Sequence, residues 1–145
     1  MDLIFLNKME KLVYDGKNAI FGRMATIISK DLLKGDSVDL INCEKIIVSG
    51  NKNLFAKKIR AKRDMGRGGS LKGPKYIRQS DRLVKRMIRG MLPRDRKKGQ
   101  DAFKRLRCHI GDGNLNENIL KDAKEFKHNM PRKFSTIKEI IRVLK

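Results

Sequence analysis

The chain opens with a strand, a helix and a second strand in quick succession, and this order limits the possible folds more than any other feature. Residues 11–14 and 38–42 are short runs with the length and composition typical of strands. A helix is expected between them, over residues 22–33, and Gly35 stands where its last turn would end. The apolar side chains that predict this helix share one face: Phe21, Met24, Ala25, Ile28 and Leu32. Together the three elements predict a βαβ unit with parallel strands and a right-handed crossover.

The middle of the chain is predicted to be helical but far more polar. Residues 46–48 form one more short apolar run, and residues 51–65 predict a helix whose cations surround its whole circumference. Such a helix has no apolar stripe of its own, so we expect it to project into a binding partner. Residues 66–79 are rich in glycine and cations, and this composition predicts a loop that cannot become ordered by itself.

A second basic helix is predicted over residues 80–91, with Ser80 as its N-cap. The helical wheel divides into two faces. The apolar face carries Leu83, Val84, Met87, Ile88 and Met91. The opposite face carries Arg82, Lys85, Arg86 and Arg89. We therefore expect one face to pack on the sheet while the other presents cations to a partner.

The last elements are shorter. Pro93 ends the second basic helix, and residues 94–99 predict a basic loop. A short helix to about Arg105 and a strand over residues 106–110 should follow. The segment 111–133 is polar, and we expect it to be irregular.

The chain should end in a helix that docks on the body of the protein. Thr136 and Glu139 have the spacing of a capping box, and an apolar stripe follows them. With 145 residues the chain is long enough to bury one core without a disulfide or a metal, so residues 1–145 predict a single domain.

Positive charge is concentrated in one part of the chain. The sequence holds 36 Lys and Arg against 16 Asp and Glu, a formal net charge of +20. Residues 1–50 sum to zero and residues 111–145 to +3, whereas residues 51–110 carry +17. Like charges repel, so folding alone does not explain this concentration, but a polyanion that neutralises it does. Nucleic acid is favoured over a membrane surface, because the chain lacks the Trp that membrane-binding helices often place beside their cations.

Other classes of protein fit the composition poorly. Cys43 and Cys108 are too few and too far apart for a secreted disulfide scaffold, and we expect both to be reduced and buried in a cytosolic protein. No apolar run approaches the roughly 20 residues of a membrane span. The opening apolar run, residues 3–6, is also too short for a signal peptide.

Two places could be read as nucleotide sites. Gly66-Arg67-Gly68-Gly69 completes neither phosphate-binding glycine motif, since Leu71 breaks the pattern. The turn from Asp15 to Gly22 lies where doubly wound folds bind nucleotides, but a strand-to-helix turn needs glycine for its geometry in any case. We expect neither place to bind a nucleotide.

Cysteine and histidine offer the remaining reactive atoms. The spacing of Cys43, Cys108, His109 and His128 fits no zinc motif, and solvent is the default for His128 among its charged neighbours. Cys108 and His109 should point to opposite faces of a strand, so they cannot form a nucleophilic pair with each other. The sequence therefore predicts no catalysis, no metal, no cofactor and no small-molecule substrate.

Several short motifs resemble the universal family of large-subunit ribosomal protein L13, over about residues 11 to 111. Around the βαβ unit they are Gly22-Arg23-Met24-Ala25, Leu32-Leu33-Lys34-Gly35-Asp36-Ser37-Val38, Ile41-Asn42-Cys43-Glu44-Lys45-Ile46 and Ser49-Gly50-Asn51. The most specific are Arg89-Gly90-Met91-Leu92-Pro93, Lys97-Lys98-Gly99-Gln100-Asp101-Ala102 and Arg105-Leu106. Gly90 and the short link before Val38 resemble the archaeal and eukaryotic branch. Cys43 departs from the alanine common in the family, and Ile110-Gly111-Asp112-Gly113 departs from its usual glycine-proline ending.

The resemblance implies a three-layer α/β/α fold with a small, mainly parallel four-stranded sheet, basic extensions and a C-terminal helix. It implies a structural constituent of the large subunit that binds and stabilises ribosomal RNA, beside neighbouring ribosomal proteins in the cytoplasm, during assembly and translation. It implies no enzymatic activity. The alternative is a small nucleotide-dependent RNA-modifying enzyme, which would need an acid or nucleophile in a cleft.

The resemblance implies an RNA-binding role for thirteen cations of the basic segment. These are Lys57, Lys58, Arg60, Arg63, Arg67, Lys72, Lys75, Arg82, Arg86, Arg89, Arg94, Lys97 and Lys98.

Overall fold

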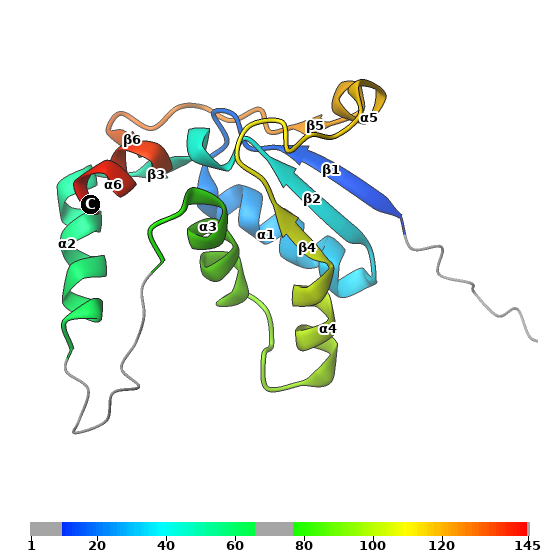
Figure 1. Ribbon diagram of the computed structural model, residues 1–145, viewed down its shortest axis with the longest axis horizontal. Coiled ribbons are helices and arrows are strands. Elements are labelled where there is room, and N and C mark those ends of the chain that lie inside the picture. The colour runs from blue at the N-terminus through cyan, green and yellow to red at the C-terminus, as the bar shows by residue number, and fades with distance from the viewer. Residues whose placement is uncertain (1–9, 66–76, 145) are drawn as a thin grey trace, which may run out of the picture.

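A parallel four-stranded sheet with helices packed around it forms the body of the protein, as the computed structural model shows for residues 10–65 and 77–144 (Figure 1). The strand order is β4-β2-β1-β5, and every neighbouring pair is parallel. The strands are β1 (Lys11–Asp15), β2 (Ser37–Ile41), β4 (Leu106–Cys108) and β5 (Lys124–Glu125). The predicted α/β class and the mainly parallel sheet are therefore confirmed.

The predicted βαβ unit is present. Helix α1 (Phe21–Lys34) connects β1 to β2, and the two strands pair in register, with Leu12 opposite Val38. The face of α1 that the sequence marks as apolar is buried, including Met24 and Ile28, which have no exposed surface. Gly35 follows the helix with φ of 123°, a conformation that favours glycine, and its N–H donates to the Asp31 carbonyl oxygen.

The end of α1 is fixed by a residue far along the chain. Helix α4 (Lys97–Arg105) lies beside α1, and the Arg105 guanidinium donates to the carbonyl oxygens of Leu32, at 2.7 Å, and Asp36, at 3.3 Å. These carbonyl groups lie at or just beyond the end of α1, where the helix leaves acceptors unsatisfied and where a cation is favourable. Arg105 therefore stabilises the fold.

A second group of elements joins the C-terminal residues to the segment that follows β2. The short 3-10 helix η1 (Cys43–Lys45) leads into β3 (Ile47–Ser49), which pairs antiparallel with β6 (Phe134–Thr136). Helix α6 (Ile137–Leu144) follows, and its apolar stripe is buried. The Glu139 N–H donates to Thr136 Oγ1 at 3.3 Å, so Thr136 caps α6 as predicted.

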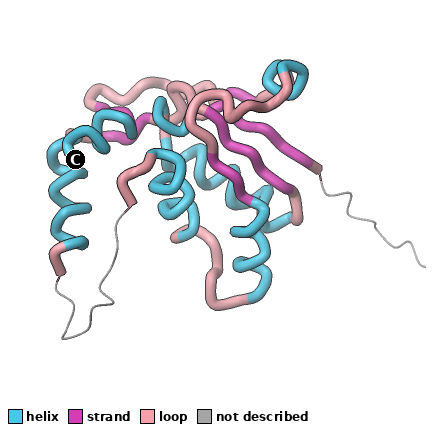
Figure 2. The backbone as a smooth tube through the Cα atoms, in the orientation of Figure 1, coloured by secondary structure: helices cyan, strands magenta, loops and turns pink. Residues whose placement is uncertain are grey.

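The segment 111–133 is more regular than expected. It contains the short helix α5 (Glu117–Lys121) and the strand β5, whereas residues 126–133 form the loop drawn in pink along the upper edge of Figure 2. β5 pairs with only two residues of β1, and Phe126 stacks on Tyr14 with ring centroids 5.1 Å apart. The order comes from these distant contacts, which no local pattern in a polar segment reveals. His128 is likewise half-buried, 6.2 Å from the Phe126 ring, instead of lying in solvent.

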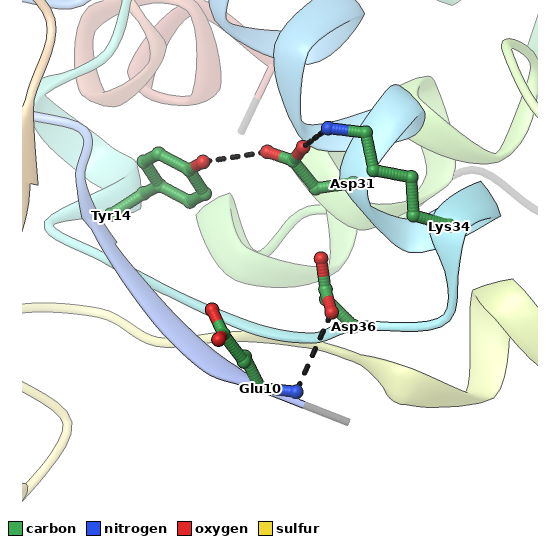
Figure 3. Close-up of polar contacts among 5 residues, drawn as sticks. All are labelled: Glu10, Tyr14, Asp31, Lys34 and Asp36. Atoms are coloured by element: carbon green, nitrogen blue, oxygen red, sulfur yellow. Dashed lines mark hydrogen bonds and ion pairs between the residues drawn. The ribbon is translucent and has the colours of Figure 1, made fainter. Parts of the chain in front are cut away.

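A hydrogen-bond network links β1 to α1 (Figure 3). The buried Tyr14 hydroxyl donates to Asp31 Oδ2 at 2.6 Å, and Lys34 Nζ lies 3.0 Å from Asp31 Oδ1. Burial disfavours the charged form of Asp31, but the hydrogen bonds from Tyr14 and Lys34 outweigh it and lower the pKa of the carboxyl group. Burial and the bond to Asp31 raise the pKa of Tyr14.

Tyr14→Phe should lower the free energy of unfolding by about 1.5–3 kcal/mol at neutral pH, because a hydrogen bond to a charged group is lost. A lowered carboxyl pKa stabilises the fold above its ordinary value of 3.8 and ceases to do so as the pH falls through the lowered value. A raised tyrosine pKa stabilises below 10.0 and ceases to do so as the pH rises further. The difference between wild type and variant should therefore close at both extremes. Urea unfolding at pH values from below 3.8 to above 10.0 measures this difference in the free energy of unfolding. A difference that stays constant with pH would contradict the assignment.

Candidate nucleic-acid interface

The first basic helix, α2 (Lys52–Arg63), begins at Asn51, whose side chain accepts a hydrogen bond from the Asn53 N–H at 3.0 Å. Ala56 and Ile59 are buried and pack toward α6, whereas the cations around them are exposed. The expectation that α2 has no apolar stripe to hold it was therefore wrong. Its stripe is narrow, and the surface that covers it comes from α6, about 80 residues later in the sequence.

One predicted RNA contact has a partner within the protein. The Arg60 guanidinium donates to the carbonyl oxygen of Val143, in the last turn of α6. A cation at this end of a helix also interacts favourably with the helix dipole. Arg60 therefore joins α2 to α6. By contrast, Arg63 pairs with its sequence neighbour Asp64, at 3.0 Å on the surface, where ion pairs contribute little.

The second basic helix, α3 (Ser80–Arg89), has the two faces that its sequence predicts. Leu83, Val84 and Ile88 are buried, while Arg82 on the other side is exposed. Lys85, Arg86 and Arg89 are partly exposed.

Three details of the predicted helix are corrected. Met87 is only partly buried, and Met91 lies beyond the end of α3 with 43% of its surface exposed. The helix ends at Arg89, two residues before the predicted end at Met91. Ser80 is the first helical residue and not the N-cap, which is Gln79.

Helix α4 brings further cations beside α3. Lys85 Nζ lies 5.1 Å from the centre of the Phe103 ring, so a cation–π contact joins the two helices. Lys97 and Lys98, expected in a loop, instead form the first turn of α4 and are exposed. Cations oppose the helix dipole at this end, and a bound anion would relieve the conflict.

The turn that precedes α4 is tightly packed. A Cβ atom on the buried Gly99 would lie 2.0 Å from the carbonyl oxygen of Pro93, so only glycine fits there. This contact brings the chain around so that the exposed Arg94 lies near the start of α4, where the Gln100 side chain donates to its carbonyl oxygen at 3.2 Å.

Two hollows lie between neighbouring pairs of these three helices. The larger, about 590 Å³, lies between α2 and α3. Its described lining residues are Phe55, Lys58, Ile59, Ala61, Lys62, Leu83, Arg86, Met87, Arg89 and Gly90. The second, about 340 Å³, lies between α3 and α4. It is lined by Arg89, Leu92, Arg94, Gly99, Gln100, Phe103 and Lys104.

The predicted site residues are thus partly brought together. Lys58 shares one hollow with Arg86 and Arg89, and Arg89 shares the other with Arg94. Lys57, Arg82, Lys97 and Lys98 are exposed on the same three helices. Arg67, Lys72 and Lys75 lie outside the described residues.

Two lining cations were absent from the predicted set. Lys62 lies one turn after Lys58 on the same wall of the larger hollow, and Lys104 lines the smaller one. The i, i+4 spacing of Lys58 and Lys62 could have identified the first of them.

The reactive side chains considered from the sequence, Cys43, Cys108 and His109, have polar neighbours within the fold. The buried Cys43 thiol lies 3.6 Å from the Leu40 carbonyl oxygen, and a hydrogen bond with Cys108 together with burial raises its pKa. A protonated thiol is a poor nucleophile. Cys108 is only partly buried, contrary to expectation, and His109 faces Asp39 at 3.7 Å instead of Cys108.

The turn after β1 leaves no room for a side chain at Gly16. A Cβ atom on Gly16 would lie 2.8 Å from the Ile46 side chain and 2.9 Å from the Ile41 carbonyl oxygen. Gly16 is therefore required for packing, in agreement with the structural interpretation of this turn. Within the described residues, no cluster of three or more metal-binding side chains occurs. None of the helices described here is long and apolar enough to span a membrane.

Comparison with known proteins identifies the family. The family model for ribosomal protein L13 matches residues 9–114. The large ribosomal subunit protein uL13 of Methanopyrus kandleri is 44% identical over 102 residues, 70% of this chain and 63% of that protein. The uL13 proteins of Archaeoglobus fulgidus (36% identity, 91% of this chain, 86% of the relative) and Methanocaldococcus jannaschii (32%, 88% and 93%) match over more of their length. The resemblance seen in the motifs is confirmed, and the chain belongs to the ribosomal protein L13 family.

Proposed function

We propose that this protein is a structural constituent of the large ribosomal subunit that binds large-subunit ribosomal RNA through the cations of α2, α3 and α4. The observation that carries the proposal is that 14 of the 21 Lys and Arg of residues 51–110 lie on three neighbouring helices, which hold only two Asp (Figure 1). The relatives' names place those proteins in the large subunit. RNA phosphates supply the negative charge that this surface lacks.

The contacts are mainly to the RNA backbone. Phe103 lies under Lys85 and Phe55 is half-buried, so these rings do not form an open platform for successive bases. The exposed side chains of the three helices are instead mostly Lys and Arg, which pair with phosphates and recognise the shape of folded RNA.

The protein acts as one folded unit beside other ribosomal proteins in the cytoplasm, and supports subunit assembly and translation. The pairing of β3 with β6 and the packing of α2 on α6 tie the C-terminal residues to the body. RNA then binds the basic surface, and neighbouring proteins contact the remaining faces.

The double variant Lys97→Gln/Lys98→Gln tests the proposed surface. It should weaken binding to purified large-subunit ribosomal RNA and lower the salt slope of log affinity by about two, one for each lost phosphate contact. The melting temperature should hold or rise, because the lysines oppose the dipole of α4. A salt-titrated binding isotherm and a melting curve measure both effects.

Lys17→Gln/Lys30→Gln is the matched control. Both lysines are exposed, but they lie in the part of the chain whose charges sum to zero. This variant should bind ribosomal RNA with nearly the wild-type salt slope. Equal losses in the two double variants would mean that the basic segment is not the RNA surface.

A further inference from the structure

The hollow between α2 and α3 combines an apolar floor with a positive rim. Ile59 and Leu83 are buried, and Phe55 and Met87 are half-buried with their side chains along the cavity. At about 590 Å³ the hollow falls within the range of small-molecule pockets, which is roughly 300–1,000 Å³. An apolar surface of this size within a strongly basic region is not explained by phosphate contacts alone.

The rim of the hollow is basic. Lys58 and Lys62 lie one helical turn apart on α2 and are exposed, and Arg86 and Arg89 line the α3 side. No acidic side chain is among the described lining residues. Long cationic side chains can cover an apolar wall with their stems while their charged ends reach outward. The hollow therefore suits a ligand with a flat apolar part and an attached anion.

We propose that this hollow receives one unstacked nucleotide of large-subunit ribosomal RNA, with its base against Phe55 and Met87 and its flanking phosphates at Lys58 and Lys62. The inference rests on the proposed function and specifies one contact within it. An RNA base has two apolar faces that stack on aromatic side chains, and its phosphates follow at a fixed covalent distance. A single inserted base would anchor an interface that otherwise consists of backbone contacts.

Charge distinguishes this occupant from the two obvious competitors. Residues 66–76, which connect α2 to α3, contain Arg67, Lys72 and Lys75 and no Asp or Glu, so they would add to the positive charge of the rim. A side chain of a neighbouring ribosomal protein could fill the apolar floor, but it would bring no phosphate for Lys58 and Lys62. A nucleotide supplies both a base for the apolar floor and phosphates for the cations of the rim.

Ala61→Trp provides the test. Ala61 is exposed and lines the hollow, so an indole there should occupy the space without removing a charge or disturbing the core. We expect affinity for purified large-subunit ribosomal RNA to fall by roughly 5- to 150-fold, the range for losing one stacked base. The salt slope should stay at the wild-type value, because the phosphate contacts of the other cations remain.

Leu54→Trp is the matched control, since it adds an indole to an exposed position of α2 outside the described lining. It should bind like wild type. Equal affinities of both tryptophan variants and wild type would overturn the inference. If wild type itself bound RNA weakly, with no salt dependence, the proposed function would fail as well.

Ultraviolet cross-linking of wild-type protein in assembled subunits gives a second measurement that does not depend on a variant. Mass spectrometry should find single nucleotides attached to peptides that contain Phe55 or Met87. Crosslinks from these peptides to residues 66–76 or to another ribosomal protein, with no nucleotide, would instead show that protein fills the hollow and would overturn the inference.

Discussion

Raising the salt concentration from 50 to 200 mM should weaken binding to large-subunit ribosomal RNA by roughly 10³–10⁵-fold, if six to ten phosphates are neutralised. Each phosphate contact releases condensed counterions, so log affinity falls linearly with log salt. The physical reason lies in the +17 carried by residues 51–110, of which α2, α3 and α4 together hold +12. Filter binding or fluorescence anisotropy at five salt concentrations gives the slope directly.

Circular dichroism at the two limiting salt concentrations is the necessary control, because a loss of folded protein would imitate a loss of affinity. Most of the cations concerned are exposed, so added salt should screen their repulsion and leave the fold intact. A nearly flat affinity across this range would mean that the basic segment does not bind RNA through its charges.

Ile88→Ala should lower the free energy of unfolding by about 2–5 kcal/mol, because it opens a cavity under α3. Ile88 has no exposed surface and belongs to the main core, unlike Met87, which the helical wheel placed beside it. Urea unfolding measures the change. Ile88→Val should cost only about 0.5–1.5 kcal/mol, since it removes one methylene.

Arg82→Ala is the companion on the opposite face of α3. Its side chain is exposed, so the free energy of unfolding should change by less than about 0.5 kcal/mol while RNA affinity falls. Stability and binding would then separate on the two sides of one helix. If Arg82→Ala unfolded the protein, or Ile88→Ala left it stable, the two faces would be assigned wrongly.

The sequence predicts the βαβ unit because its signals are local. The apolar spacing of α1 and the glycine after it lie within a stretch of about 15 residues, and each agrees with the tertiary contacts that the helix makes. The charge distribution is equally readable, since it needs only a count. These two features indicated the α/β class and a polyanionic partner, whereas the family came from the short motifs.

Other features depend on contacts between distant residues, and local patterns do not reveal them. The stripe of α2 consists of little more than Ala56 and Ile59, which looks too narrow until α6 covers it. β5 exists because Phe126 stacks on Tyr14 and the adjoining residues reach the free edge of β1. Both predictions failed because the stabilising partner lies far away in the sequence.

The candidate interface was predicted as a set of residues but not as a shape. Lys57, Lys97 and Lys98 are exposed, as a contact with RNA requires, whereas Arg60 bonds α6. The hollow between α2 and α3 could not be foreseen, because it depends on how far apart two helices pack. Helical spacing placed Met87 in the core, yet the neighbouring helix leaves it half-open.

The docking of α2 on α6 has a consequence for the order in which the protein takes shape during synthesis. The hydrogen bonds that join these regions span 83 residues, from Arg60 to Val143, and 85 residues, from Ser135 to Gly50. A nascent chain that has exposed the βαβ unit, α3 and α4 still lacks the surface that covers Ala56 and Ile59. The most basic helix therefore reaches its place only after residues 134–144 have left the translating ribosome. Until then its cations cannot be held in a fixed arrangement, and an incomplete chain cannot present the finished surface to RNA.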